Sequence, residues 1–215
     1  MQHSNLLFIL VCVCLFAGPA KARVGSPVKH ETVYINGRKL RFEQSLPLIE
    51  KMLVSTNKTE VEGAVTAVKR WAWQLKGHPI MQTLAERYKR EKDANLKIQL
   101  LQAIGGVGDP STRALLKKES ESKNELIKEL ALGGLAIQRC RWAVVALAKL
   151  MVTTSDPAIA AECKVLLFGF LDEIRPIEAF NFSWPAARKQ RYFQSLVDSG
   201  IFARLNTDGQ PLVEQ

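Results

Sequence analysis

The alternation of apolar and polar positions along this chain predicts a series of short amphipathic helices. Apolar residues that recur at every third or fourth position fall on one face of an α-helix. One such face follows Asn57 and consists of Val61, Ala64, Val65, Val68, Trp71, Ala72 and Leu75. Several of the segments start at Asn or Asp, residues whose side chains cap helix N-termini. We therefore expect a mainly α-helical chain.

One helical unit recurs between about Asp93 and Leu171. Its starts are Asp93-Ala-Asn-Leu, Lys123-Asn-Glu-Leu and Asp156-Pro-Ala-Ile, which lie 30 and 33 residues apart. The first two are followed by similar segments, Ala103-Ile-Gly-Gly and Ala131-Leu-Gly-Gly, and the third by Leu166-Leu-Phe-Gly. We expect the first helix to stop at Gly105-Gly106, and Asp109-Pro110 to begin the next. Repeats of this length are typical of solenoids.

A β-hairpin is predicted ahead of the helices. In residues 31–42, Asn36-Gly37 separates two short runs rich in β-branched and aromatic residues. Asn-Gly supplies the two positive φ angles of a type I′ turn. Because an isolated hairpin is only marginally stable, we expect it to lie against the first helices and to cover the end of the stack. The alternative is an edge strand that recruits a partner.

Paired antiparallel helices, Asp-Pro starts such as Asp156-Pro157 and late Gly-Gly pairs resemble HEAT or HEAT-like repeats over about residues 57 to 171. The resemblance implies an α-solenoid of degenerate HEAT-like helical pairs, with second helices lining a concave face that holds another macromolecule. Some HEAT-like proteins are enzymes, among them phycobilin lyases and a DNA alkyl-base glycosylase. No catalytic residue of either can be placed on this sequence.

The chain divides into four expected segments. Residues 1–22 resemble a secretory signal peptide, with the apolar run Leu6 to Ala17 followed by Gly18-Pro19 and the cleavage pattern Ala20-Lys-Ala22. That run is shorter than the roughly 20 apolar residues of a spanning helix, although an uncleaved anchor is the alternative. Residues 23–44 hold the hairpin, 45–205 the HEAT-like domain, opening at Ser45-Leu-Pro47, and 206–215 a disordered tail. We expect an exported protein, periplasmic or secreted.

Two cysteines, Cys140 and Cys163, follow the predicted signal peptide. An oxidising compartment would permit a disulfide between them. The interpretation that we favour is two small, buried apolar side chains. The sequence has no CxxC, HExxH or Cys/His cluster, so we predict no metal site and no cofactor.

The formal net charge of +9 is typical of a solvated basic surface that keeps a protein soluble, and it also favours acidic partners. Basic residues gather in several clusters, of which Arg188, Lys189 and Arg191 follow Trp184 closely, and exposed aromatic and Arg side chains are enriched at binding surfaces. The first group of candidate partner-binding residues is Trp73, Arg87, Lys89 and Arg90, and the second is Trp184, Arg188, Arg191 and Tyr192. The alternative for Trp184 is a loop that clamps the last helices.

These features predict a non-catalytic binding or scaffold module that holds a protein partner. We name no catalytic residue, because no nucleophile motif such as G-x-S-x-G is present and no spacing of acids, or of Cys and His, favours a catalytic set. Two alternatives stay open. One is a nucleic-acid-binding HEAT-like protein, including a base-excision type, and the other is a binder of polyanions or anionic membrane surfaces through the same cations.

Overall fold

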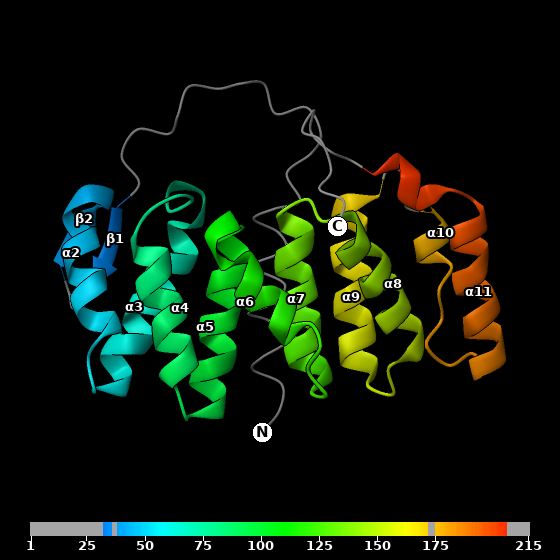
Figure 1. Ribbon diagram of the computed structural model, residues 1–215, viewed down its shortest axis with the longest axis horizontal. Helices are drawn as coiled ribbons and strands as arrows, with labels where there is room; N and C mark the ends of the chain where they lie inside the picture. Colours follow the sequence, from blue (N-terminus) through cyan, green and yellow to red (C-terminus); the bar gives the residue numbers. More distant parts are fainter. Residues whose placement is uncertain (1–31, 36–37, 172–174, 206–215) are drawn as a thin grey trace. The chain divides into compact units, whose positions relative to one another are not determined.

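The computed structural model describes residues 32–35, 38–171 and 175–205. Within these ranges the chain is mainly helical, which confirms the expected class (Figure 1). The predicted signal peptide, the Asn36-Gly37 turn and the predicted tail lie outside the described residues. In the described part of the chain, no helix combines the length and the apolar character that crossing a bilayer requires.

The described elements fall into two compact units, one within residues 32–143 and one within residues 144–205. The first unit contains β1 (Thr32–Ile35), β2 (Arg38–Arg41), α2 (Phe42–Leu53), α3 (Lys58–Arg70), the 3-10 helix η1 (Ala72–Gln74), α4 (Ile80–Arg90), α5 (Ala94–Val107), η2 (Pro110–Thr112), α6 (Arg113–Glu119) and α7 (Glu125–Ile137). The second contains most of α8 (Arg141–Thr153), then α9 (Pro157–Phe170), α10 (Arg175–Glu178), α11 (Ala186–Asp198) and η3 (Ile201–Arg204).

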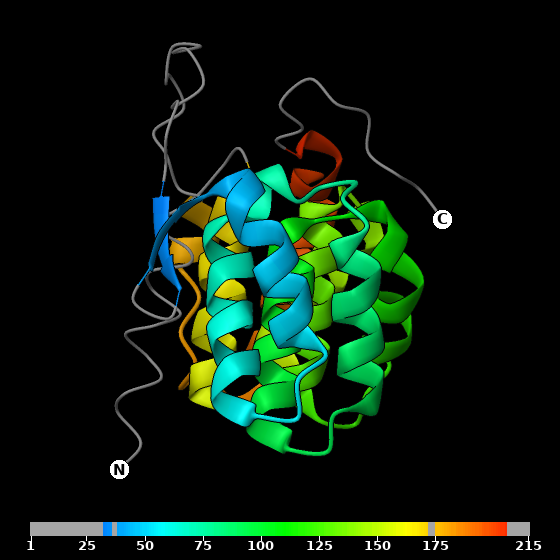
Figure 2. The same ribbon diagram turned by 90° about the vertical axis from the view of Figure 1, so that its left-hand side faces the viewer.

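The helices of the first unit pack in two rows. In one row α3 packs against α5 and α5 against α7. In the other α2 packs against α4, and cross-contacts join α2 to α3, α4 to α5 and α6 to α7. Figure 2 views this unit from the end that carries α2 and the hairpin. The apolar face predicted after Asn57 lies between the rows, where Val61, Val65, Val68, Trp71 and Leu75 are fully buried.

The helix starts follow the predicted caps. The side chain of Asn57 accepts a hydrogen bond from the Thr59 N–H at 3.0 Å, and that of Asp93 accepts one from the Leu96 N–H at 2.9 Å. In the second repeat the cap is Asn124, one residue after the expected start at Lys123; it accepts from Leu126 and Ile127 at 3.0 and 3.2 Å. Asp156 accepts from Ala158 at 2.8 Å. Each cap satisfies N–H groups that the first helical turn leaves unpaired.

The expectation that the glycine pair Gly105-Gly106 ends its helix is wrong. Helix α5 continues through the pair to Val107 and ends at Gly108, whose φ of +64° is the left-handed conformation of a helix C-terminus. The role of Gly105 is the contact between α5 and α7. A Cβ atom on Gly134 of α7 would lie 2.6 Å from the Cα atom of Gly105, so the two backbones can approach only without side chains.

The N-terminal strands pair antiparallel, with Val33 opposite Leu40. Both strands contact α2, and β1 also contacts α3. Helix α2 begins at Phe42, directly after β2, and includes Pro47, so the expected start at Ser45 is wrong. The side chain of Gln44 accepts a hydrogen bond from the Arg41 N–H at 3.2 Å, which favours a helix start before Ser45.

In the second unit, α10 packs against α9 and η3 against α11. An antiparallel bridge joins Leu171, at the end of α9, to Leu205, just after η3. The segment after α11 therefore folds back to the end of α9, and its apolar residues Ile201, Phe202 and Leu205 are buried.

Candidate functional site

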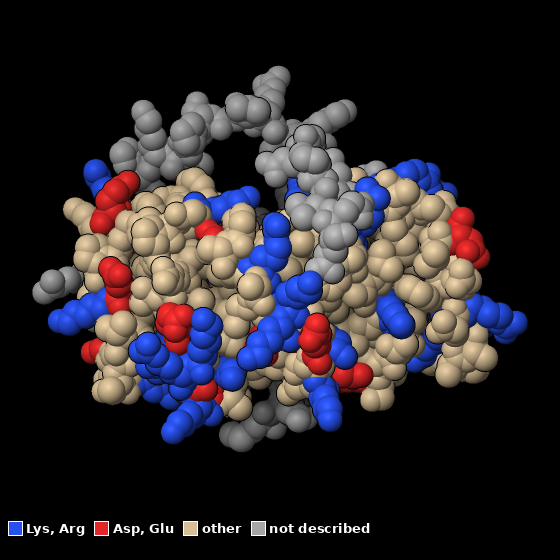
Figure 3. Space-filling model, in the orientation of Figure 1, with Lys and Arg blue, Asp and Glu red and all other residues tan. Residues whose placement is uncertain are grey.

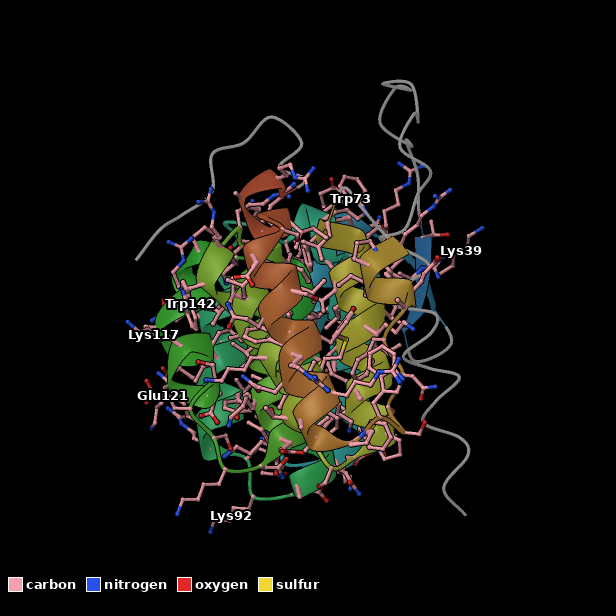
Figure 4. The ribbon with its side chains drawn as sticks, turned by 90° about the vertical axis from the view of Figure 1, so that its right-hand side faces the viewer. Lys39, Trp73, Lys92, Lys117, Glu121 and Trp142 are labelled. Atoms are coloured by element: carbon pink, nitrogen blue, oxygen red, sulfur yellow. The ribbon has the colours of Figure 1, made fainter. Side chains whose placement is uncertain are left out.

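The two groups of candidate partner-binding residues differ in how they are placed. In the first group, Trp73 lies in η1 and is 60% exposed, whereas Arg87, Lys89 and Arg90 lie in the last turn of α4. Figure 4 shows Trp73 at one edge of the first unit and Lys92, which lies just past the end of α4, at the opposite edge. The first group is therefore not a single site.

The α4 cations are largely paired with carboxylates. Arg87 contacts the Glu91 carboxylate at 2.7 Å and donates to the Ser55 carbonyl at 3.1 Å. Lys89 contacts Glu86 at 2.7 Å, and this hydrogen bond lowers the pKa of Glu86. Arg90 is exposed. Figure 3 shows acidic atoms interspersed among basic atoms over this helix, so little of its positive charge is left for a partner.

The second group comes together in the second unit. Trp184 lies just before α11, and Arg188, Arg191 and Tyr192 lie on that helix, which faces the viewer in Figure 4. These four residues and Ser195 line a concavity of about 520 Å³ that is open to solvent. Spacings of three and four residues put Arg188, Tyr192 and Ser195 on one face of the helix.

A packed aromatic cluster forms the base of this α11 surface. The rings of Trp184 and Tyr192 are 5.5 Å apart between centroids and meet edge to face at 69°. Phe180, which is buried, lies 6.1 Å from Trp184 and 5.6 Å from Tyr192. Edge-to-face and tilted pairs at these distances are favourable aromatic geometries. The cluster fixes the position of Trp184 relative to α11, as expected for a loop clamped on the last helices.

Polar contacts hold α10 and the loop that follows it in place. The Tyr192 hydroxyl donates a hydrogen bond to the Pro176 carbonyl, and burial raises the pKa of Tyr192, so the hydroxyl keeps its proton. Lys164 of α9 donates to the carbonyls of Glu178 and Phe180 at 3.0 and 3.2 Å. The α11 surface is therefore built on a fixed backbone.

Two cations of the α11 surface contact aromatic rings. The Arg188 guanidinium lies 4.2 Å from the centroid of the Trp184 ring, and the Lys189 ammonium lies 4.0 Å from that of Phe182. In the ranges that the structure describes, no carboxylate forms an ion pair with Arg188, Lys189 or Arg191. Cation–π contacts leave the positive charge of these groups available to an external anion.

Lys164→Met is expected to lower the free energy of unfolding by about 1.5 kcal/mol, because two carbonyls lose a charged hydrogen-bond donor. Lys149→Met, on the exposed side of α8, is the matched control and is expected to change it by less than about 0.5 kcal/mol. Urea denaturation followed by circular dichroism measures both. Equal effects of the two substitutions would contradict the role of Lys164.

Two residues were missing from the sequence-based candidates: Ser195, which lines the concavity, and Phe180, the buried member of the aromatic cluster. Ser195 follows Arg188 by seven residues, so helical periodicity could have identified it. Phe180 was recognisable only as part of an aromatic loop, because its ring contacts depend on how the loop packs on α11.

Cys140 and Cys163 are both buried, as the interpretation that we favoured requires. Burial raises the pKa of the Cys140 thiol, which keeps it protonated and unreactive. The two residues belong to different units, and a disulfide between them stays the alternative to this interpretation. No group of three or more His, Cys, Asp or Glu residues in the described part of the chain could hold a metal ion.

Comparisons of this chain with protein-family models, with curated proteins and with solved structures found no match.

Proposed function

We propose that this chain is an exported, non-catalytic binding module in which HEAT-like helical pairs form an α-solenoid that holds a protein partner. The two rows of helices in the first unit support the solenoid, as do the caps Asp93, Asn124 and Asp156, which recur near the repeat spacing. Export rests on the signal-peptide pattern of residues 1–22.

The observation that carries the binding role is the contrast between the two basic helices. Arg87 and Lys89 of α4 are paired with acids, whereas Arg188 and Lys189 of α11 lie over aromatic rings and Arg191 lines the concavity beside them. Arg and Trp side chains that are fixed in place lose little conformational entropy on binding and dominate many protein interfaces. The partner therefore docks on the α11 surface.

Crosslinking followed by affinity capture and mass spectrometry tests this proposal. The bait is the full chain in its own cells, next to a Trp184→Ala/Arg188→Ala variant and a control variant of α4, Lys89→Ala/Arg90→Ala. We expect one protein, present in stoichiometric amount and retained at high salt, to be captured by the wild type and the control and lost with the α11 variant.

Other outcomes of the same experiment contradict the proposal. Nucleic acid or lipid recovered only at low salt would favour the electrostatic alternatives, because phosphate contacts weaken steeply with salt. A protein partner that the α11 variant still captures would place the docking surface elsewhere. The N-terminus of the mature protein, read by mass spectrometry, is expected to follow Ala22; an N-terminus at Met1 or Gln2 would contradict export.

A further inference from the structure

The polar residues of the α11 surface form a line along the helix. Arg188, Arg191 and Ser195 follow one another at three and four residues, and Tyr192 lies beside them. Seven helical residues rise about 10 Å at 1.5 Å each. An extended peptide advances about 3.3 Å per residue, so three to four of its residues match this length.

The charge on this line favours an anionic ligand. Arg188 and Lys189 lie in the first turns of α11, where the helix dipole is positive and cations are unfavourable. In the first turn of α11 there is no acidic residue, and Pro185 at the cap position provides no side-chain acceptor. The helix dipole therefore does not stabilise these cations, which are held by the Trp184 and Phe182 rings. A bound carboxylate would offset the unfavourable dipole by contacting both the guanidinium groups and the positive helix end.

The arrangement of the aromatic rings disfavours nucleic acid as the ligand of this surface. Proteins that bind single strands stack bases on open ring faces. The Arg188 guanidinium covers a face of Trp184, and the ring also meets Tyr192 and Phe180 at 69° and 77°. Because the Arg188 guanidinium covers one face of the Trp184 ring and Tyr192 and Phe180 pack against the ring, a base has little open ring face on which to stack. A peptide chain can still pack against the exposed part of the ring.

The spacing of the two arginines indicates a pattern in the ligand. Residues three apart on a helix have Cβ atoms about 5–6 Å apart. In an extended peptide, side chains at alternate positions point to the same side and are about 6.6 Å apart. Two carboxylates separated by one residue can therefore each meet one guanidinium, whereas adjacent carboxylates point to opposite sides.

We propose that the α11 surface binds an extended acidic peptide segment of its protein partner, with Asp or Glu at alternate positions contacting Arg188 and Arg191. This inference rests on the proposed function and adds the chemistry of the partner. Trp184 and Tyr192 contact the peptide backbone between the two acids, and their clustering with Phe180 keeps the surface formed before the peptide arrives.

Fluorescence polarisation with the full chain tests the inference. The probes are two labelled peptides of equal composition and charge, one with two Glu residues separated by Ala and one with the two Glu residues adjacent. We expect the alternating peptide to bind about tenfold more tightly, because the peptide with adjacent Glu residues loses one bidentate Arg–carboxylate contact. Arg188→Gln/Arg191→Gln is expected to remove this preference, and Lys89→Gln/Arg90→Gln, which changes the charge equally, to keep it.

Equal affinity for the two peptides, or equal loss in both variants, would overturn the inference. Binding of oligothymidine or of phosphatidylserine vesicles that depends on Arg188 and Arg191, without peptide binding, would also overturn it. A failure of the inference alone is recognisable, because the partner captured by crosslinking would still be lost with the Trp184→Ala/Arg188→Ala variant. If the proposed function itself fails, that loss disappears as well.

Discussion

Gly134→Ala is expected to lower the free energy of unfolding by about 3 kcal/mol, near the upper end of the range for overpacking a protein interior. The added methyl group would lie 2.6 Å from the Cα atom of Gly105 and 3.0 Å from Cδ1 of Leu116. Leu116 can change its rotamer, but the Gly105 backbone cannot move without displacing α5. Urea denaturation followed by circular dichroism measures the change.

Gly106→Ala is the matched control, because Gly106 is the next residue to Gly105 on the same helix. A Cβ atom there meets nothing within 4 Å. Alanine is favoured over glycine inside a helix by about 0.5–1 kcal/mol, so this variant is expected to be more stable than the wild type. Opposite signs for the two substitutions would identify the α5–α7 contact as the reason for the glycines. A mild effect of Gly134→Ala would instead show that the two helices can separate freely.

The helix caps were predicted correctly from the sequence, whereas the role of the glycines was not. The caps Asn57, Asp93 and Asp156 were predicted correctly, because a cap acts on N–H groups only two or three residues away. The role of Gly105 was missed, since it depends on α7, which follows about thirty residues later along the chain. Local patterns identify a helix start more readily than a contact between helices.

The candidate site shows a similar division. The sequence analysis identified both groups of basic candidates, but it did not consider which of them have acidic residues at helical spacing. Glu86 and Glu91 stand at helical spacings of three and four from Lys89 and Arg87, while no acid occupies those spacings around Arg188 or Arg191. This distinction was present in the sequence. The stacking of Arg188 on Trp184 was not, because the loop conformation before α11 depends on Lys164 of another helix.

Asp109 is a second position where a local signal concealed a longer-range role. The sequence predicted it as a helix start, and its side chain does accept a hydrogen bond from the Ser111 N–H at 2.8 Å. The other carboxylate oxygen accepts one from the Gly77 N–H, thirty-two residues away. The Asp109 carbonyl accepts from the Gln138 side chain at 2.8 Å. This buried residue thus joins the loop before α4, the helix η2 and the end of α7.

The hydrogen bonds of Asp109 also determine its protonation. Burial raises the pKa of the carboxyl, but the hydrogen bonds from Ser111 and Gly77 and the charge of Lys76 oppose this effect, and the net pKa lies below its ordinary value of 3.8. Because the folded pKa is depressed, the ionised group stabilises the fold above the ordinary value. This contribution is lost as the pH falls through the folded pKa.

Asp109→Asn is therefore expected to lower the free energy of unfolding by about 2 kcal/mol at neutral pH, since an amide replaces a charged acceptor of two N–H groups. The difference from the wild type is expected to shrink below about pH 4, where Asp109 of the unfolded wild type takes up a proton. Asp156→Asn is the control: Asp156 is exposed, and Asn caps a helix equally well, so a change under about 0.5 kcal/mol is expected. Urea denaturation of the three proteins from pH 7 to pH 3 measures these differences, and a difference for Asp109→Asn that does not vary with pH would show that the charge of Asp109 contributes nothing to stability.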